Sequence, residues 1–150
     1  MRTIIPPPLQ GLLIGVAMWL VALGLPMLAA PFPGYKYLAA LLFMAGAIIE
    51  IIAILTFIRR KTTVNPMTPS NASVLVVNGL YRFSRNPMYL ALLLVLAGWA
   101  LWLGNAANVA LVAVFFWYIT EYQIKPEEAA LKEKFGDEYE QYRKRVRRWI

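Results

Sequence analysis

Two clusters of polar side chains have the types and the spacing to do chemistry. In the first, residues 78–89, arginines and tyrosines precede a long apolar run. Asn86 and Pro87 stand where that run begins, and asparagine at the cap with proline at the first helical position is typical of a helix start. The unsatisfied N–H groups of such a helix end, together with the guanidinium groups of Arg82 and Arg85, suit a carboxylate or a phosphate.

The second cluster is the pair Glu127 and Glu128, which follows Pro126. Two carboxylates suit an ammonium group or the hydroxyls of a ribose. A ligand with a carboxylate, an ammonium and a ribose would fit both clusters, and S-adenosylmethionine is one such molecule among other zwitterionic nucleotides. Each feature also has a structural explanation: a helix cap at Asn86, arginines that anchor the chain at a membrane, and glutamates favoured in the first turn of a helix.

The residue types that are missing narrow the chemistry further. The chain has no cysteine and no histidine, which excludes the usual zinc, haem and iron–sulfur ligands, disulfides, and any scheme that needs an imidazole base. We therefore predict no metal site. Any reaction must rely on carboxylates, phenols, arginines, backbone groups or a bound cofactor.

Two more carboxylates lie within apolar runs. Glu50 stands in the middle of one run, where an ionisable group is costly unless it is paired or faces a polar cavity. It is a candidate functional group, with a hydrogen-bonded structural carboxyl as the alternative. Glu121 falls in the last turn of another run and can reach the surface. Either could bind or deprotonate a protonated amine on an acceptor molecule, which makes both candidate catalytic residues.

The composition places these clusters in a membrane. Of the 150 residues, 60% are hydrophobic and only 15% are charged, which is unlike an ordinary soluble domain. The net charge of +7 could also indicate nucleic acid, but basic residues beside apolar runs more often face anionic lipid. We expect membrane lipid as a partner and no nucleic acid.

The apolar runs predict an all-α membrane protein that forms a single domain over residues 1–150. Four transmembrane helices are expected, followed by a C-terminal amphipathic helix on the cytoplasmic membrane surface, with a break or kink at Lys125-Pro126. The predicted spans are residues 9–30, 35–58, 87–103 and 106–124, and the tail helix is residues 126–146. The apolar stripe of the tail helix comprises Leu131, Phe135, Tyr139, Tyr142 and Val146.

The sequence also predicts the connections between the spans and the packing of the first span. Residues 59–78 have the polar and proline content of a connecting loop, and Gly104-Asn105 is predicted to be a tight turn. A cleaved signal peptide is the alternative to the first span, but the apolar run is too long for one. Gly11 and Gly15 allow a close helix approach, which packing within the chain explains better than dimerisation.

The distribution of positive charge predicts the orientation. Only Lys36 lies on the side of the first hairpin turn, and the other lysines and arginines lie at the N-terminus, in the middle loop and in the tail. The positive-inside rule then puts both termini in the cytoplasm, as an even number of spans requires. Residues 82–89 and the tail should therefore meet at one cytoplasmic interface, joined by the third and fourth spans.

These motifs resemble a known family of membrane enzymes. The sequences GLYRFSRNPMY at residues 79–89, PEEAAL at 126–131 and FGDEYEQY at 135–142 flank a helical hairpin. In this arrangement they are similar to the isoprenylcysteine carboxyl methyltransferase and phospholipid methyltransferase superfamily. The resemblance covers roughly residues 59–150.

The resemblance implies S-adenosylmethionine as cofactor, held at the cytoplasmic face between an Arg-x-Pro-x-Tyr element and a Glu-Glu element. The expected cofactor-binding residues are Tyr81, Arg82, Arg85, Asn86, Pro87, Tyr89, Glu127 and Glu128. Three positions depart from the family pattern: Asn86 stands where the carboxyl methyltransferases have histidine, and Leu80 and Ala91 stand where proline and glycine are common. Asn-Pro-Met-Tyr is closer to phospholipid N-methyltransferases and to many bacterial relatives.

The expected function is methyl transfer to a lipophilic acceptor that enters from the bilayer. Candidate acceptors are a phospholipid amine, an isoprenylcysteine-like carboxylate and a hydrophobic thiol. The expected location is the inner (plasma) membrane of a bacterial or archaeal cell, with both termini in the cytoplasm. The alternative is a non-enzymatic scaffold or transporter subunit whose basic tail binds anionic lipid.

Overall fold

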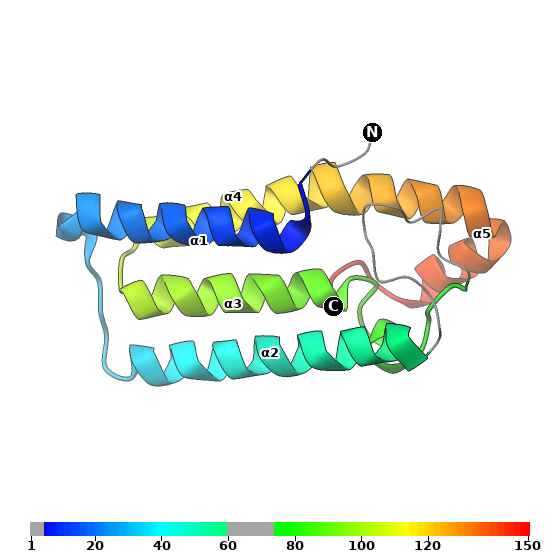
Figure 1. Ribbon diagram of the computed structural model, residues 1–150, viewed down its shortest axis with the longest axis horizontal. Helices are drawn as coiled ribbons and strands as arrows, with labels where there is room; N and C mark the ends of the chain where they lie inside the picture. The colour runs from blue at the N-terminus through cyan, green and yellow to red at the C-terminus, as the bar shows by residue number, and fades with distance from the viewer. Residues whose placement is uncertain (1–4, 60–73) are drawn as a thin grey trace.

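The computed structural model describes residues 5–59 and 74–150, and within these ranges every regular element is a helix (Figure 1). Three helices are long and apolar enough to cross a membrane, and a fourth apolar helix, α3, is shorter. The elements in chain order are α1 (Pro7–Gly24), η1 (Pro26–Leu28), α2 (Tyr35–Arg59), η3 (Gly79–Arg82), α3 (Pro87–Leu103), α4 (Ala107–Ile119), η4 (Thr120–Ile124) and α5 (Lys125–Arg145).

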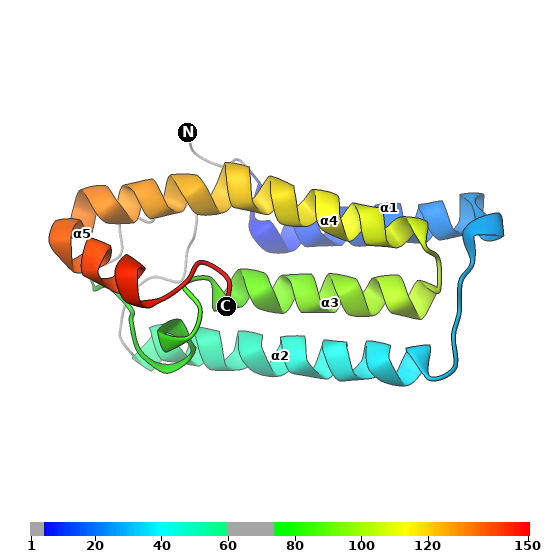
Figure 2. The same cartoon turned by 180° about the vertical axis from the view of Figure 1, so that it is seen from behind.

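Helix α3 lies in the middle of the bundle, with α2 on one side and α1 and α4 on the other (Figures 1 and 2). The contact with α2 is close because glycines line it. A Cβ added to Gly46 would lie 2.9 Å from the carbonyl oxygen of Ala91, and one added to Gly98 would lie 3.0 Å from that of Ala39. Residues with almost no side chain therefore let the two backbones meet.

Helix α1 packs against α3 and α4 through the small residues singled out in the sequence. Gly11 lies against Leu92, and the Trp99 indole N–H donates a hydrogen bond of 2.9 Å to the carbonyl oxygen of Gly15. Packing within the chain thus occupies this surface, as predicted.

The first helix differs from the predicted span of residues 9–30. It begins at Pro7 and ends at Gly24. The reason is Pro26, since the residue before a proline is driven out of the helical region, and Leu25 has φ −125° and ψ 58°. The spans predicted for residues 35–58 and 87–103 agree with α2 and α3 to within one residue.

Of the break or kink predicted at Lys125-Pro126, the structure contradicts the break. The chain passes from α4 through a π-helical turn, η4, into α5 without leaving helical geometry. Pro126 has no N–H to donate to the i−4 carbonyl, and it lies just after the π-helical turn, where the regular α-helical hydrogen-bond pattern is interrupted. The chain bends instead at Gly136, whose φ of 50° and ψ of −122° no other residue type adopts readily.

The apolar stripe of α5 is buried against protein. Beyond Gly136, Tyr139 and Tyr142 pack with Leu75 and Val146. These contacts fold the last part of α5 back toward the start of α3 (Figure 2). The stripe therefore has a protein partner, and the predicted position of this helix on the membrane surface stays a prediction. Most of the loop predicted for residues 59–78 lies outside the described residues.

The long helices alternate in direction, so that α1 and α3 begin at the end of the bundle where α2 and α4 finish (Figure 1). The stretch before α3 and all of α5 lie at this end, which we call the polar end. Lys36 lies at the opposite end, with its ammonium 5.8 Å from the Tyr35 ring centroid and 5.7 Å from that of Trp102.

Candidate functional site

Asn86 occupies the N-cap position of α3, but its side chain does not cap the helix. Its Nδ2 donates a hydrogen bond of 3.0 Å to the carbonyl oxygen of Arg148, far along the chain. Its own N–H donates to the Ser84 hydroxyl at 3.1 Å, and its carbonyl oxygen accepts from the Leu90 N–H. The predicted helix start is confirmed, whereas the predicted side-chain cap is wrong because the amide serves a tertiary contact.

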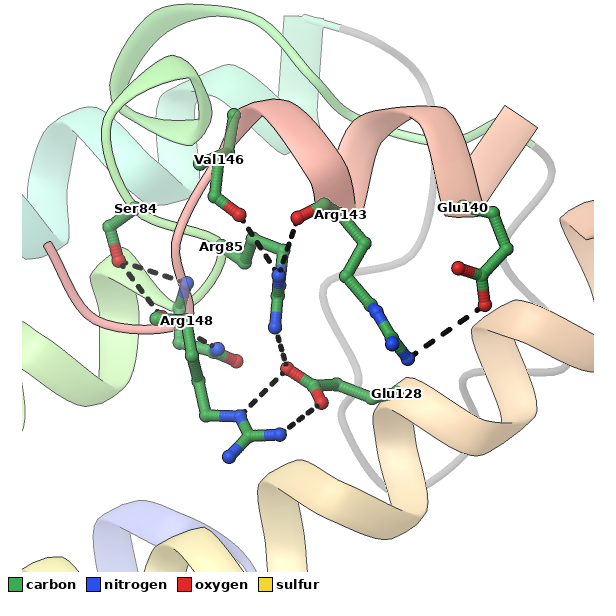
Figure 3. A network of polar contacts seen from close by, with 8 residues as sticks. Ser84, Arg85, Glu128, Glu140, Arg143, Val146 and Arg148 are labelled. Carbon is green, nitrogen blue, oxygen red and sulfur yellow. Dashed lines mark hydrogen bonds and ion pairs between the residues drawn. The ribbon is translucent and has the colours of Figure 1, made fainter. Parts of the chain in front are cut away.

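Arg85 joins the two predicted clusters directly (Figure 3). Its Nη2 donates to Glu128 Oε1 at 2.7 Å. Its Nη1 donates to the carbonyl oxygens of Arg143 and Val146, at 3.2 and 2.9 Å. Its backbone N–H donates to the carbonyl oxygen of Arg147 at 3.0 Å. With only 9% of its side chain exposed, Arg85 holds the end of α5 beside the start of α3.

Glu128 accepts from a second guanidinium. Arg148 donates through Nε to Oε1 at 3.0 Å and through Nη2 to Oε2 at 2.7 Å. This is the bidentate geometry in which a guanidinium binds a carboxylate most strongly. Burial alone would raise the pKa of Glu128. The hydrogen bonds from Arg148 and Arg85 have the opposite and larger effect together, so this pKa lies below its ordinary value. Glu128 is therefore an anion at neutral pH.

Glu127 has different surroundings. It accepts a hydrogen bond of 2.9 Å from the Tyr89 hydroxyl at Oε2. Burial raises the pKa of Glu127 to about 7, a change that the Tyr89 hydrogen bond moderates and the charge of Glu128 reinforces. Two adjacent glutamates thus differ in charge state near neutrality, since Glu128 stays ionised and Glu127 titrates there.

The π-helical turn η4 helps to form this arrangement. It contains Gln123, whose side chain is buried and hydrogen-bonds Tyr89. A π-helical turn inserts a residue into a helix and rotates the helix beyond it, and such turns are frequent at functional sites. Gln123 and Glu127, four residues apart, both reach the tyrosine on α3.

Tyr81 links the site to α2. It is buried, packs with Ala53, and its carbonyl oxygen accepts a hydrogen bond of 2.7 Å from the Tyr142 hydroxyl. Burial is the main cause that raises the pKa of Tyr81, and the charges of Tyr142, Glu127 and Glu50 add to it. The charges of Glu50 on α2 and of Glu127 on α5 thus both act on Tyr81.

The remaining predicted residues lie at the surface. Arg82 is exposed at the end of η3. Glu121 pairs with Lys125 one turn away, and both side chains are at least one-third exposed. The structure thus brings together Arg85, Asn86, Pro87, Tyr89, Glu127 and Glu128, with Tyr81 beside them, whereas Glu50 lies on α2 and acts on Tyr81 only through its charge.

Sequence patterns missed four participants. Ser84, Gln123, Tyr142 and Arg148 all contact the predicted residues. Tyr142 belongs to the apolar stripe of the tail, so its burial could be expected, but its hydroxyl contact could not. No local pattern distinguishes Arg148 from the other basic residues around it.

Comparison with known proteins identifies the family. The sequence profile of the phospholipid methyltransferase family matches residues 35–138. The chain belongs to this family. An uncharacterized protein of Haemophilus influenzae is 51% identical over 63 residues, which are 42% of this chain and 100% of that protein.

Several relatives have names that describe a reaction. Protein-S-isoprenylcysteine O-methyltransferase of Schizosaccharomyces pombe is 38% identical over 73 residues, 49% of this chain and 31% of that protein. Protein-S-isoprenylcysteine O-methyltransferase A of Arabidopsis thaliana is 30% identical over 121 residues, 77% of this chain and 61% of that protein. The chain thus covers less than two-thirds of the length of these enzymes. The family and these names indicate a methyltransferase, and the apolar helices indicate an integral membrane protein.

Proposed function

We propose that this family member transfers a methyl group from S-adenosylmethionine to a lipophilic acceptor at the cytoplasmic surface of the membrane. The observation that carries the proposal is the meeting of the two motif halves at the polar end: Arg85 contacts Glu128, and Tyr89 contacts Glu127. Neither contact is local in sequence, so the fold assembles one site from two elements.

The residues present fit the groups of this donor. The start of α3 offers backbone N–H groups and positive dipole character to a carboxylate. Tyr89 donates to Oε2 of Glu127, and the same carboxylate could accept from an ammonium group or a ribose hydroxyl of the donor. When bound, the donor supplies an electrophilic methyl group. The chain aligns the acceptor with that methyl and excludes water, because an in-line displacement needs little else.

The acceptor side of the proposed site is α2. Glu50 is a partly buried carboxylate on α2, and its charge reaches Tyr81 beside the motif residues. It could bind an ammonium group of the acceptor or take the proton that an amine must lose before methylation. Glu121 is the weaker candidate for this role because Lys125 already pairs with it.

The topology we propose has four spans, with both termini in the cytoplasm. Helix α3 has 17 residues, a length of about 25 Å against a hydrocarbon core of about 30 Å. Its central place between α2 and the α1–α4 pair supports this short span, because it packs against longer helices on both sides. The polar end then lies at the cytoplasmic interface, where a phospholipid amine, an isoprenylcysteine-like carboxylate or a hydrophobic thiol can enter from the bilayer.

Calorimetric titration of the detergent-solubilised protein with S-adenosylhomocysteine tests the cofactor. We expect saturable binding with one site per chain. A folded protein that shows no binding would contradict the proposal and favour a non-enzymatic membrane scaffold. Methyl transfer from labelled donor is then screened against membrane lipid extracts, isoprenylcysteine analogues and hydrophobic thiols to identify the acceptor.

A further inference from the structure

The last residues of the chain form a strap across the start of α3. We call residues 146–150 the C-terminal strap. Its carbonyl oxygens at Val146 and Arg147 accept hydrogen bonds from the side chain and the backbone of Arg85. Its carbonyl oxygen at Arg148 accepts from Asn86 Nδ2. Three successive residues of the strap thus contact the residues that precede α3.

The strap is also fixed to two other helices. The Trp149 ring lies with its centroid 4.9 Å from that of Phe116 on α4, and Trp149 packs against the hydrophobic core. The Arg148 side chain reaches Glu128 on α5 (Figure 3). One short segment therefore connects the start of α3, α4 and α5.

The two glutamates of the motif are not equally available to a ligand. Glu128 is 13% exposed and accepts three hydrogen bonds from two guanidinium groups, those of Arg85 and Arg148. A ligand ammonium could reach it only by displacing a guanidinium from a largely buried pair, which would leave a charge uncompensated. Glu127 accepts from a neutral phenol, that of Tyr89, and can exchange or share that bond at little electrostatic cost.

We propose that Glu128 and Arg148 are positioning residues, whereas Glu127 and Tyr89 contact the methyl donor. The Arg148–Glu128 pair holds α5 and the C-terminal strap so that Glu127 faces Tyr89 at the start of α3. This assignment rests on the proposed function. It adds Arg148, which lies outside the motifs, and it gives the two glutamates separate tasks.

A double-mutant cycle tests the assignment. The affinity for S-adenosylhomocysteine is measured by calorimetry for the wild type, Arg148→Ala, Glu128→Gln and the double variant. Arg148→Ala breaks the Arg148–Glu128 pair alone, whereas Glu128→Gln also weakens the pair with Arg85. We therefore expect Arg148→Ala to weaken binding about tenfold, Glu128→Gln to weaken it at least as much, and the double variant to bind no worse than Glu128→Gln. Arg148→Lys, which keeps the charge, should recover part of the affinity. Additive losses, or an Arg148→Ala variant with wild-type affinity, would overturn the proposal.

Two further variants separate positioning from general damage. Arg147→Ala removes an exposed arginine on the same strap, so it should bind like the wild type. The pH dependence of binding should survive in Arg148→Ala and disappear in Glu127→Gln; the reverse pattern would assign direct contact to the wrong glutamate. If the wild type does not bind S-adenosylhomocysteine, the proposed function fails, whereas wild-type binding with an unaffected Arg148→Ala variant refutes only this inference.

Discussion

The two ends of the helix bundle are held together in different ways. At the end that contains Lys36, backbone and amide groups join the connections: the Ala30 N–H donates to the Gly104 carbonyl oxygen at 2.7 Å, and Asn105 Nδ2 donates to the Leu25 carbonyl oxygen at 2.8 Å. At the polar end, charged side chains join the segments, with Arg85 and Arg148 bound to Glu128. The neutral hydrogen bonds at the far end only fix the connections between helices. The charged groups at the polar end can also bind a charged ligand.

The difference between the two ends indicates where function resides. At the far end, Asn105 is 5% exposed and its side-chain oxygen also caps α4 by accepting from the Ala107 N–H at 3.0 Å. These contacts serve the fold. At the polar end, ionisable groups with shifted pKa values gather around Tyr89, which is typical of a site rather than of a turn. Substitutions at the two ends should therefore separate stability from ligand binding.

The largest effect is expected for Arg85→Ala at the polar end. The change leaves Glu128 with one cationic partner and frees two carbonyl oxygens at the end of α5. Loss of one partner from such a buried pair costs about 3 kcal/mol, so both thermal stability and donor binding should fall, the latter by about 100-fold. Thermal unfolding in detergent and calorimetry measure the two losses.

Arg145→Ala is the matched control for that change. Its side chain is exposed and bonds within its own helix turn, to the Gln141 carbonyl oxygen. We expect wild-type stability and affinity. Equal losses in the two variants would mean that positive charge in general, rather than the contacts of Arg85, supports the polar end.

Glu127→Gln should weaken donor binding by about 10- to 100-fold without unfolding the protein, because it removes a charge and keeps the shape. The effect depends on pH. With a pKa of about 7, Glu127 becomes an anion as pH rises through neutrality, so wild-type affinity for a ligand ammonium should rise over that range. The variant should show a flat profile. Calorimetry across neutral pH measures both, and the exposed Glu133→Gln is the control.

The same carboxyl should affect stability with the opposite sign. Its pKa is raised in the folded protein, so the folded state binds more protons than the unfolded state between the ordinary value of 4.5 and about 7. The stabilising contribution is therefore present at low pH and is lost as pH rises toward 7. Thermal unfolding of Glu127→Gln should lack this decrease, and an identical pH dependence in both proteins would contradict the assignment.

Asn105→Ala should destabilise the far end by about 2 kcal/mol, since it removes a helix cap and a hydrogen bond to Leu25. Donor affinity should not change in the protein that remains folded. Thermal unfolding with and without S-adenosylhomocysteine checks this. A ligand that binds both proteins with the same affinity adds the same free energy of stabilisation to each. A loss of affinity would show that the two ends are coupled.

The smallest effect is expected for Gly104→Ala. Gly104 ends α3 with φ 60°, a conformation that costs an alanine about 1 kcal/mol. The space around a new methyl group is open enough, with the Tyr35 ring at 3.6 Å. Thermal unfolding should record this small loss at unchanged affinity; a loss several times larger would mean that the turn does more than end the helix.

The sequence determined the features that depend on neighbouring residues. The lengths of the apolar runs predicted α2 and α3 to within a residue, and Gly104-Asn105 predicted the turn after α3. The two motif halves were predicted to meet because alternating helices return to the same end. These inferences succeed because helix length, turn chemistry and the direction of the chain are local or additive properties.

The tertiary structure decided what each polar side chain does. Asn86 has the residue type of a helix cap, yet its side-chain amide donates a hydrogen bond to the carbonyl oxygen of Arg148, 62 residues away. Glu127 and Glu128 are identical in type and adjacent, yet burial sets the pKa of Glu127 near neutrality, whereas the hydrogen bonds from two arginines hold Glu128 ionised. Contacts between distant segments leave no periodic pattern in the sequence, and a pKa depends on burial and on the charges nearby. The division of work between the two glutamates is therefore visible only in the fold.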